Sequence, residues 1–568
     1  MGLLTLLLTN LFTFVGPWIA KQAIDGLQAG LSATTLLRYC LLILGAALLQ
    51  GICRYWSRLL VIGVSREVEF DLRNIVFARL LAQAPAFFQR YRTGDLMSRA
   101  TADIEAVRMV IGPGIMQLAN TVFTFVIAIA MMLSLDRVLT LWSLMPMPAI
   151  ALVMYLSAQL YHRRFLDVQV QQAKLNSIAQ ENFSGIRVVK TYGLEQPQRE
   201  VFISANREYL ARNMTLARAL GFFHPLVAMI AGLGTLVVLW AGGRRIIAGE
   251  CTLGTLVAFM ALFGLLTWPT IALGWVVSLF QRGSASMGRI NEILAAPVAV
   301  AEPDDPVALP ESDSGAALEV RRLTFTYPGR AEPVLRDVSF TINAGERVAI
   351  VGRTGSGKTT LLLLIPRLWS VTDGRIFLDG VDINRLRLDL LRSTIGFVPQ
   401  ETFLFSDTLA ANIALPDGEA DASALPEVAA AGELAQFAGD VMGFPDGWRT
   451  LVGERGITLS GGQKQRAAIA RALVRHPRLL IFDDAFSSVD TETEEKILDG
   501  VMTAHPERTV LFVSHRLSTM RRADRILVFD NGALVESGTH EALMARDGSY
   551  RRLIDQQLLA DELEREDI

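Results

Sequence analysis

The chain has 568 residues and a formal net charge of −3. This length exceeds the roughly 100–200 residues of a single domain, and a charge so close to zero gives no reason to expect a nucleic-acid partner. Half of the residues are hydrophobic (51%), and the three cysteines, Cys40, Cys53 and Cys251, lack metal-ligand spacing.

The first half of the chain is predicted to be a membrane domain. A bilayer-spanning helix needs about 20 mostly apolar residues, and six segments meet this requirement: 3–24, 36–63, 107–134, 138–160, 219–241 and 252–280. The connections near Asp25, Asp136 and Arg245 are short, whereas 64–106 and 161–218 are long, polar and predicted to be helical. We therefore predict an all-α transmembrane domain of six helices over 1–294.

Basic residues predict the orientation of these spans. The two long connections are rich in Arg and Lys, whereas the short ones hold only Lys21, Arg137, Arg244 and Arg245. The positive-inside rule places the long connections in the cytoplasm. The sixth span then also ends in the cytoplasm, so we expect a multi-pass protein of the cell (inner) membrane whose following domain is cytoplasmic.

The composition of the spans indicates what could pass between them. Spans 219–241 and 252–280 contain no Asp, Glu, Lys or Arg, so a path lined by them would be apolar and aromatic. Arg54 and Arg58 in the second span would be costly if they faced lipid. They could line a cavity, snorkel or pair within the bundle, and we favour pairing. His224 is interpreted as a packing residue rather than a proton relay.

Residues 295–315 are rich in Pro, Ala and acidic residues and show no periodicity, which predicts a linker. Residues 316–568 have the composition of an ordinary α/β domain. Within it, a strand at 347–351 leads into a loop that is followed by an apolar helix. The loop reads Gly352, Arg353, Thr354, Gly355, Ser356, Gly357, Lys358, Thr359, with Thr360 next.

This loop matches the GxxxxGK[ST] pattern in the strand–loop–helix context that the pattern requires. Its glycines let backbone N–H groups point at phosphate, and the helix adds its positive N-terminal end. Lys358 is predicted to reach the β- and γ-phosphates, and Thr359 to supply an oxygen to Mg²⁺. The sequence therefore predicts a nucleotide with Mg²⁺.

Two further motifs follow in the same domain. The apolar strand 479–482 ends in Asp483 and Asp484, the position at which P-loop ATPases organise Mg²⁺. Between this strand and the loop, Ser460, Gly461, Gly462 and Gln463 open a helix. Ser460 is a suitable helix N-cap, and the two glycines let N–H groups approach an anion.

The LSGGQ sequence over 459–463 closely resembles the signature of the ATP-binding-cassette superfamily. By that resemblance, Tyr327 stacks on the adenine of ATP, and Gln400 senses Mg²⁺ and the attacking water. Asp490 lies in the loop that crosses to the other ATPase domain, and His515 contacts the γ-phosphate.

The resemblance covers almost the whole chain. FFQRYRTGDLMSRATADIEAVR (87–108) and SASMGRINEIL (284–294) resemble the MdlA-type multidrug and lipid exporters, a type IV exporter subfamily. It implies an all-α six-helix transmembrane domain fused to an α/β P-loop ATP-binding-cassette domain. The activity implied is ATP-driven export of hydrophobic or amphipathic cargo, with a second exporter half and membrane lipid as partners. Short coupling helices are expected near 103–108 and 183–192.

Two positions depart from the family pattern. Family members usually carry a cytoplasmic helix before the first span, whereas here the span starts at residue 3. We expect that either an N-terminal segment is missing or this helix is absent. The second departure is Asp484, where the family has the glutamate that polarises the attacking water. A displacement near 1 Å can cost about 10²-fold in rate.

Asp484 leaves more than one reading open. It is either a working base in a slower homodimer or a degenerate site in a heterodimer whose other chain supplies a glutamate, and we favour the heterodimer. A weakly hydrolysing ATP-gated or regulatory subunit is a third possibility, and four intact residues argue against it: Lys358, Thr359, Asp483 and His515. An importer is disfavoured because importers commonly carry the two domains on separate chains.

Overall fold

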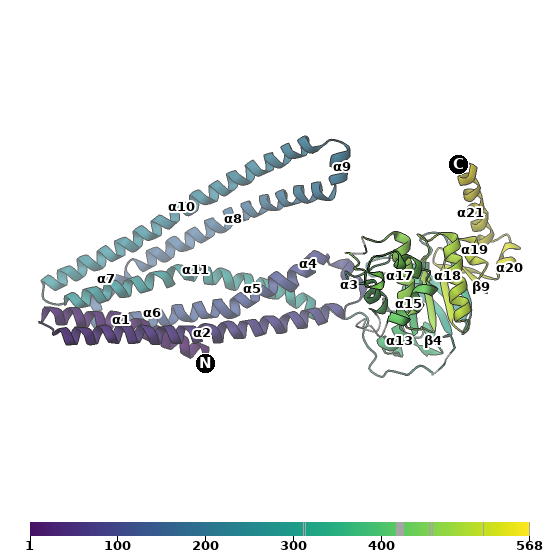
Figure 1. Cartoon of the computed structure of the whole chain (residues 1–568). Coiled ribbons are helices and arrows are strands. Elements are labelled where there is room, and N and C mark those ends of the chain that lie inside the picture. The colour runs from purple at the N-terminus through teal and green to yellow at the C-terminus, as the bar shows by residue number, and fades with distance from the viewer. Residues whose placement is uncertain are drawn as a thin grey trace. The chain divides into compact units, whose positions relative to one another are not determined.

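The computed structural model describes residues 1–310, 312, 314–415, 425–453, 456, 458–514 and 516–566. His515 lies outside the described residues, and the side chain of His224 is not described either. The chain divides into two units, one of residues 1–81 with 93–296 and one of residues 82–92 with 297–568. Figure 1 shows the first as long helices and the second as a mixed α/β body.

The first unit contains six helical segments that are long and apolar enough to cross a membrane. The predicted spans fall on these segments, the sixth beginning at the N-cap residue Thr252. The segments are α1 (Gly2–Gln28), α2 (Ala33–Leu81), the run α4 (Thr93–Ser98), η1 (Arg99–Asp103), α5 (Ile104–Met109), η2 (Val110–Gly114) and α6 (Ile115–Leu135), then α7 (Arg137–Leu144) with α8 (Met147–Ser184), α10 (Glu195–Ile247) and α11 (Leu253–Ala295).

The long cytoplasmic connections continue the membrane helices. Helices α8 and α10 lie side by side and are joined at their ends by the short α9 (Ile186–Thr191), as Figure 1 shows. This short helix falls in the expected range 183–192.

The other expected short helix is at a different place. Residues 103–108 lie inside the continuous run from α4 to α6, and the short helix of the first connection is α3 (Pro85–Arg90). Ala84 is extended and Pro85 occupies the first helical turn, where its missing N–H and fixed φ favour a helix start. Helix α3 belongs to the second unit, where Ala86 packs against one of the hydrophobic cores of that unit.

Charged residues of the first connection pair with one another. The buried Glu69 of α2 accepts a hydrogen bond from Arg66 and lies 3.4 Å from the Nε of Arg108 on α5. Asp103 accepts a hydrogen bond of 2.8 Å from the Nε of Arg289 on α11. These contacts fasten α2, the run from η1 to α5, and α11 together around the cytoplasmic ends of the predicted membrane spans.

Arg54 and Arg58 differ from these residues. Both side chains are exposed, and neither makes a hydrogen bond or an ion pair within the part of the chain that the structure describes. The expected pairing within the bundle is therefore wrong for contacts inside this chain.

The second unit contains two sheets. The antiparallel one has the order β2 (Leu335–Ile342), β1 (Leu318–Phe325), β4 (Ile376–Leu378), β5 (Val381–Asp382). The larger one has the order β10 (Ala533–Gly538), β9 (Arg525–Asp530), β3 (Arg347–Gly352), β8 (Thr509–Val513), β7 (Leu479–Asp483), β6 (Ile395–Val398). Strands β9 to β6 are parallel, and only β10 runs antiparallel.

Besides α3, the helices described in this unit connect and cover the strands. They are η3 (Ile383–Arg385), α12 (Lys358–Leu364), α13 (Leu388–Thr394), α14 (Leu409–Ala414), α15 (Leu425–Leu434), α16 (Ala438–Met442), η6 (Gly447–Arg449), α17 (Gly461–Leu473), α18 (Thr491–Ala504), α19 (Leu517–Met520), α20 (His540–Met544) and α21 (Ser549–Glu566). Because both faces of the parallel sheet are covered, β7 and β8 are buried throughout and are apolar except for Asp483 at the end of β7 and Thr509 at the start of β8. The carboxyl ends of β3, β8 and β7 therefore meet at one edge, where ligands of such sheets bind.

Candidate functional site

A glycine-rich loop joins β3 to α12 at this edge. Gly352, Gly355 and Gly357 have φ values of 152°, 82° and 97°, which residues with a Cβ rarely adopt. A Cβ on Gly352 would lie 2.2 Å from the carbonyl oxygen of Phe529 on β9. The backbone can take this path only with glycine, which explains the spacing of the motif.

Lys358 and Ser356 lie in this loop as the sequence predicts. The Nζ of Lys358 donates to the carbonyl oxygens of Gly352 at 2.8 Å and Arg353 at 3.0 Å. Burial lowers the pKa of this ammonium group. The Ser356 hydroxyl is buried without a hydrogen-bond partner among the described residues, although buried polar groups normally have one. An ammonium group and a free hydroxyl in such a loop fit the oxygens of a phosphate chain.

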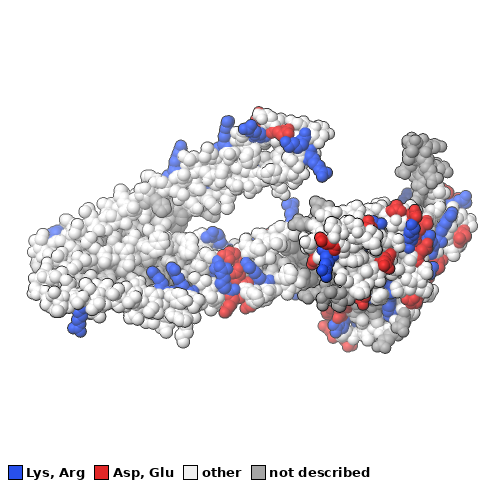
Figure 2. Space-filling view, viewed as in Figure 1, with Lys and Arg blue, Asp and Glu red and all other residues white. Residues whose placement is uncertain are grey.

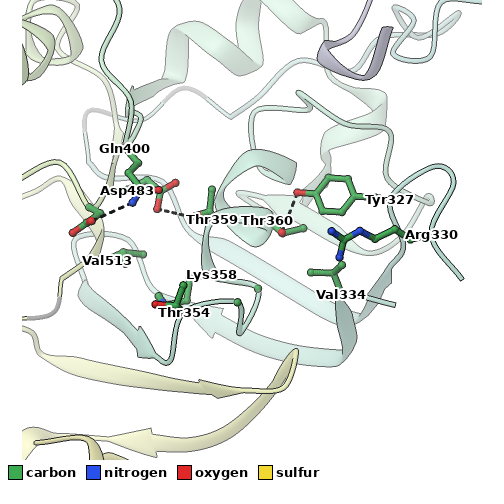
Figure 3. A pocket seen from close by; sticks show the side chains of 13 residues that line it. Tyr327, Arg330, Val334, Thr354, Lys358, Thr359, Thr360, Gln400, Asp483 and Val513 are labelled. Atoms are coloured by element: carbon green, nitrogen blue, oxygen red, sulfur yellow. Dashed lines mark hydrogen bonds between the residues drawn. The ribbon is translucent and has the colours of Figure 1, made fainter. Parts of the chain in front are cut away.

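Two carboxylates face the loop from the end of β7. The Thr359 hydroxyl donates to Asp483 at 3.0 Å, and the Gln400 amide donates to Asp484 at 3.3 Å (Figure 3). Asp483 is buried, and that burial raises its pKa to about 6. Asp484 has a φ of 50°, a left-handed conformation that Asp adopts more readily than most residues. The structure thus brings together four residues that the sequence assigned to one site.

An aromatic side chain closes the other end of the cavity. The Tyr327 hydroxyl donates to Thr360 at 3.0 Å, and the edge-to-face contacts of its ring have centroid distances of 4.7 Å to Trp369 and 5.0 Å to Phe325. The cavity has a volume of about 310 Å³ and extends from Tyr327 and Arg330 to the two carboxylates. Figure 3 shows this arrangement, in which the Tyr327 ring and the Lys358, Asp483 and Gln400 side chains lie in different parts of the cavity, as a base followed by phosphates would require.

Sequence reasoning missed two contributors to this end of the cavity. Arg330 lines it, and Trp369 orients the ring of Tyr327. Arg330 lies in a turn three residues after Tyr327, and an arginine in a turn is too common to predict a binding site. Trp369 lies among apolar residues beyond α12, and nothing in its local sequence indicates a contact with Tyr327.

The signature residues form a separate structure. Ser460 caps α17: its hydroxyl accepts from the N–H of Gln463 at 3.3 Å, and the Gln463 side chain accepts from the N–H of Ser460 at 3.0 Å. Cβ atoms on Gly461 and Gly462 would lie 3.3 Å and 2.8 Å from Ser488 atoms. Residues 460–463 do not line the cavity around Lys358, so within one chain they leave an exposed helix N-terminus.

Asp490 caps the next helix instead of lining the cavity. Its carboxylate accepts from the N–H of Thr493 at 2.9 Å at the start of α18. His515 lies outside the described residues, but its neighbour Arg516 is described. That guanidinium pairs with the buried Glu494 and donates to the carbonyl oxygen of Val489 at 2.7 Å. The segment after β8 is thereby joined to the loop that contains Asp490.

Comparison with known proteins assigns both halves of the chain. The family described as "ABC transporter transmembrane region" matches residues 1–270, and the family described as "ABC transporter" matches residues 335–487. The chain is similar in fold to a bacterial Atm1-family ABC exporter with ATP bound. That match has a TM-score of 0.81 and 29% identity, and covers 98% of this chain and 97% of the other.

Three relatives are similar over nearly their whole length. The multidrug resistance-like ATP-binding protein MdlA of Escherichia coli (strain K12) is 36% identical and covers 98% of this chain and 93% of its own. The probable multidrug resistance ABC transporter protein YheI of Bacillus subtilis (strain 168) is 36% identical, with coverages of 98% and 95%. An ATP-dependent lipid A-core flippase of Syntrophus aciditrophicus (strain SB) is 32% identical, with coverages of 99% and 92%.

Proposed function

This chain belongs to the ABC transporter family, and from that premise we propose that it is one half of a heterodimeric exporter. Its own Walker residues, which are Lys358 and Thr359 after the glycine-rich loop and Asp483 and Asp484 at the end of β7, would form the slower of two ATP sites. It is a multi-pass protein of the inner membrane with a cytoplasmic ATPase domain, and it couples ATP hydrolysis to export. Its similarity to multidrug transporters and lipid A-core flippases supports a hydrophobic or amphipathic cargo, a drug or a lipid.

The observation that supports the heterodimer is the side chain of Asp484. The family pattern has a glutamate after the last residue of β7, and here the carboxylate is one methylene shorter. It is also held by the Gln400 amide, which leaves less freedom to reach a water at the γ-phosphate. Since a shift near 1 Å can cost about 10²-fold in rate, a partner chain with a glutamate would provide the faster site.

The proposed cofactors are ATP and Mg²⁺. Lys358, Ser356 and the loop N–H groups would bind the phosphates, and Tyr327 would stack on adenine. Thr359, Asp483 and Gln400 would hold Mg²⁺, which neutralises charge on the β- and γ-phosphates when bound. Among the described residues no three His, Cys, Asp or Glu side chains form a metal cluster. This fits an ion held by a single carboxylate together with a hydroxyl, an amide, phosphates and water.

A gain-of-function substitution tests the heterodimer. Asp484→Glu should raise the steady-state ATPase rate of the chain purified alone by about 10-fold or more, because it restores the missing methylene. Asp389→Glu is the matched control, since it adds the same methylene to an exposed carboxylate outside the cavity. Addition of a glutamate-bearing partner half should raise the wild-type rate similarly. A lone chain that is already fully active, and that Asp484→Glu does not accelerate, would support the homodimer instead.

A further inference from the structure

Helix α2 carries two arginines one turn apart, Arg54 and Arg58, that are exposed and have no partner among the described residues. No Asp or Glu occurs between residues 26 and 66. Helix α1 packs along α2, and its one acidic residue, Asp25, lies at the end that is far from Arg54 and Arg58. On the viewed face of the helical unit, Figure 2 shows red side chains only away from the end that joins α1 to α2. Acidic residues of α1 and α2 are therefore absent at the level of the two guanidinium groups.

The length of α2 gives the depth of these arginines. The helix begins at Ala33 on the outer side and rises about 1.5 Å per residue. Arg54 and Arg58 are 21 and 25 residues further along, or about 32 and 38 Å. Counted back from the cytoplasmic end of the predicted span 36–63, they lie 9 and 5 residues, or about 14 and 8 Å, inside that end, so both guanidinium groups would extend from within the span toward the cytoplasmic headgroups, as long basic side chains near helix ends do.

The neighbouring helices are polar at the same level. Gly2 packs against Val61, and the Gln50 amide donates to the Thr13 hydroxyl at 2.9 Å, so α1 runs antiparallel to α2 in a fixed register. This register sets Thr9 and Asn10 beside residues 53 and 54.

Asn10 also forms hydrogen bonds with polar residues of α6 at this level. Its amide donates to Asn120 at 3.0 Å, and it accepts from the Thr124 hydroxyl at 2.8 Å. Next to them, the Thr121 hydroxyl is buried without a partner among the described residues. The two amides and the Thr124 hydroxyl bond to one another inside the bundle, and none of these groups brings negative charge to the level of the two exposed guanidinium groups.

We propose that Arg54 and Arg58 bind the phosphate group of an anionic phospholipid in the cytoplasmic leaflet. Guanidinium groups bind phosphate oxygens in a bidentate manner, and anionic lipids concentrate in that leaflet. Tyr55 and Trp56 between them are 62% and 48% exposed, and such aromatic rings settle at the membrane interface. The lipid site does not depend on whether the exporter is a homodimer or a heterodimer.

The test uses the full-length chain in nanodiscs that contain phosphatidylcholine with one-fifth phosphatidylglycerol. Lipid retained after mild delipidation is measured by native mass spectrometry. We expect the wild type to retain phosphatidylglycerol several-fold above its share of the bilayer. Arg54→Gln with Arg58→Gln should abolish this enrichment, and Arg54→Lys with Arg58→Lys should keep part of it. Arg38→Gln, which removes an exposed arginine from the outer end of α2, should leave it unchanged.

Two results would overturn the proposal. One is equal phosphatidylglycerol enrichment in the wild type and the double glutamine variant, which would mean that the arginines face water or a protein partner. The other is displacement of the lipid by millimolar inorganic phosphate, which would indicate a site for free phosphate. Unchanged ATP affinity of the double variant verifies that it is folded, because neither arginine lies in the nucleotide cavity.

Discussion

Tyr327 is held in position by its hydrogen bond to Thr360 and by the edge of Trp369. Replacement with alanine should weaken ATP binding by about 1–3 kcal/mol, the value of a base–aromatic stack. Replacement with phenylalanine keeps the ring and loses one hydrogen bond, so its effect should stay within about 1 kcal/mol. Isothermal titration of the full chain measures both. Equal losses for the two variants would mean that the hydroxyl, and not the stack, governs affinity.

Asp483 is expected to cost stability in the absence of nucleotide. Burial raises the pKa of this carboxyl from 3.8 to about 6, so the folded state holds its proton more tightly than the unfolded state. The stability of the nucleotide-free protein therefore falls as pH rises from about 4 to 6, and the loss persists above pH 6.

Asp483→Asn should remove that cost while keeping an acceptor for the Thr359 hydroxyl. At pH 7 we expect the nucleotide-free ATPase domain within the full chain to gain about 1–3 kcal/mol, and at pH 3.5 almost nothing. Mg²⁺-dependent ATP binding should be lost at the same time. Denaturant titration followed by tryptophan fluorescence at the two pH values measures the difference. Destabilisation at pH 7 would show that the charged form is stabilised by its surroundings.

At the scale of elements, α18 is fastened to the segment after β8 by one buried carboxylate. Glu494 is fully buried, pairs with Arg516 and accepts from the Thr519 hydroxyl. Arg516→Ala would leave this carboxylate without its counterion. Because removal of one partner of a buried ion pair costs about 3–5 kcal/mol, the ATPase domain should unfold at markedly lower denaturant concentration.

A double variant separates the ion pair from general packing. Glu494→Gln with Arg516→Ala has no unpaired charge, so it should recover a large part of the lost stability. Arg522→Ala is the matched control, because its carboxylate partners Glu495 and Asp499 are more exposed, and such pairs contribute about 0–1 kcal/mol. Equal stability of the single and double Arg516 variants would contradict the role of the pair.

Local sequence determines most of the elements but not the contacts between distant ones. The apolar length of the spans and the GxxxxGK[ST] loop can be predicted because each depends on neighbouring residues. The start of α3 at Pro85 was missed, although a proline at the first helical turn is a local signal. The contact of Trp369 with Tyr327 and the lack of a partner for Arg54 depend on residues far apart in the sequence. No local pattern could have revealed them.

At the scale of the whole molecule, the cavity and the signature helix of one chain do not form a single site. Lys358, Thr359, Asp483 and Asp484 share one cavity, whereas Ser460 and Gly461 lie outside it. In the proposed heterodimer, each ATP lies between the Walker residues of one chain and the signature of the other. This chain then contributes its cavity to the slow site and the N-terminus of α17 to the fast one.

That division predicts unequal effects of two substitutions in the same assembled heterodimer. Gly461→Asp sets a negative charge at the N-terminal end of α17, where charge on the γ-phosphate must be stabilised during transfer, and should nearly abolish turnover. Gly461→Ala is its control, since its Cβ meets Ser488 at the same 3.3 Å without the charge, and it should retain most activity. Asp484→Ala should lower turnover only slightly, because its site contributes little to the total. ATPase rates at saturating ATP decide the matter: if Asp484→Ala is as damaging as Gly461→Asp, the two sites are equivalent and Asp484 is a working catalytic base.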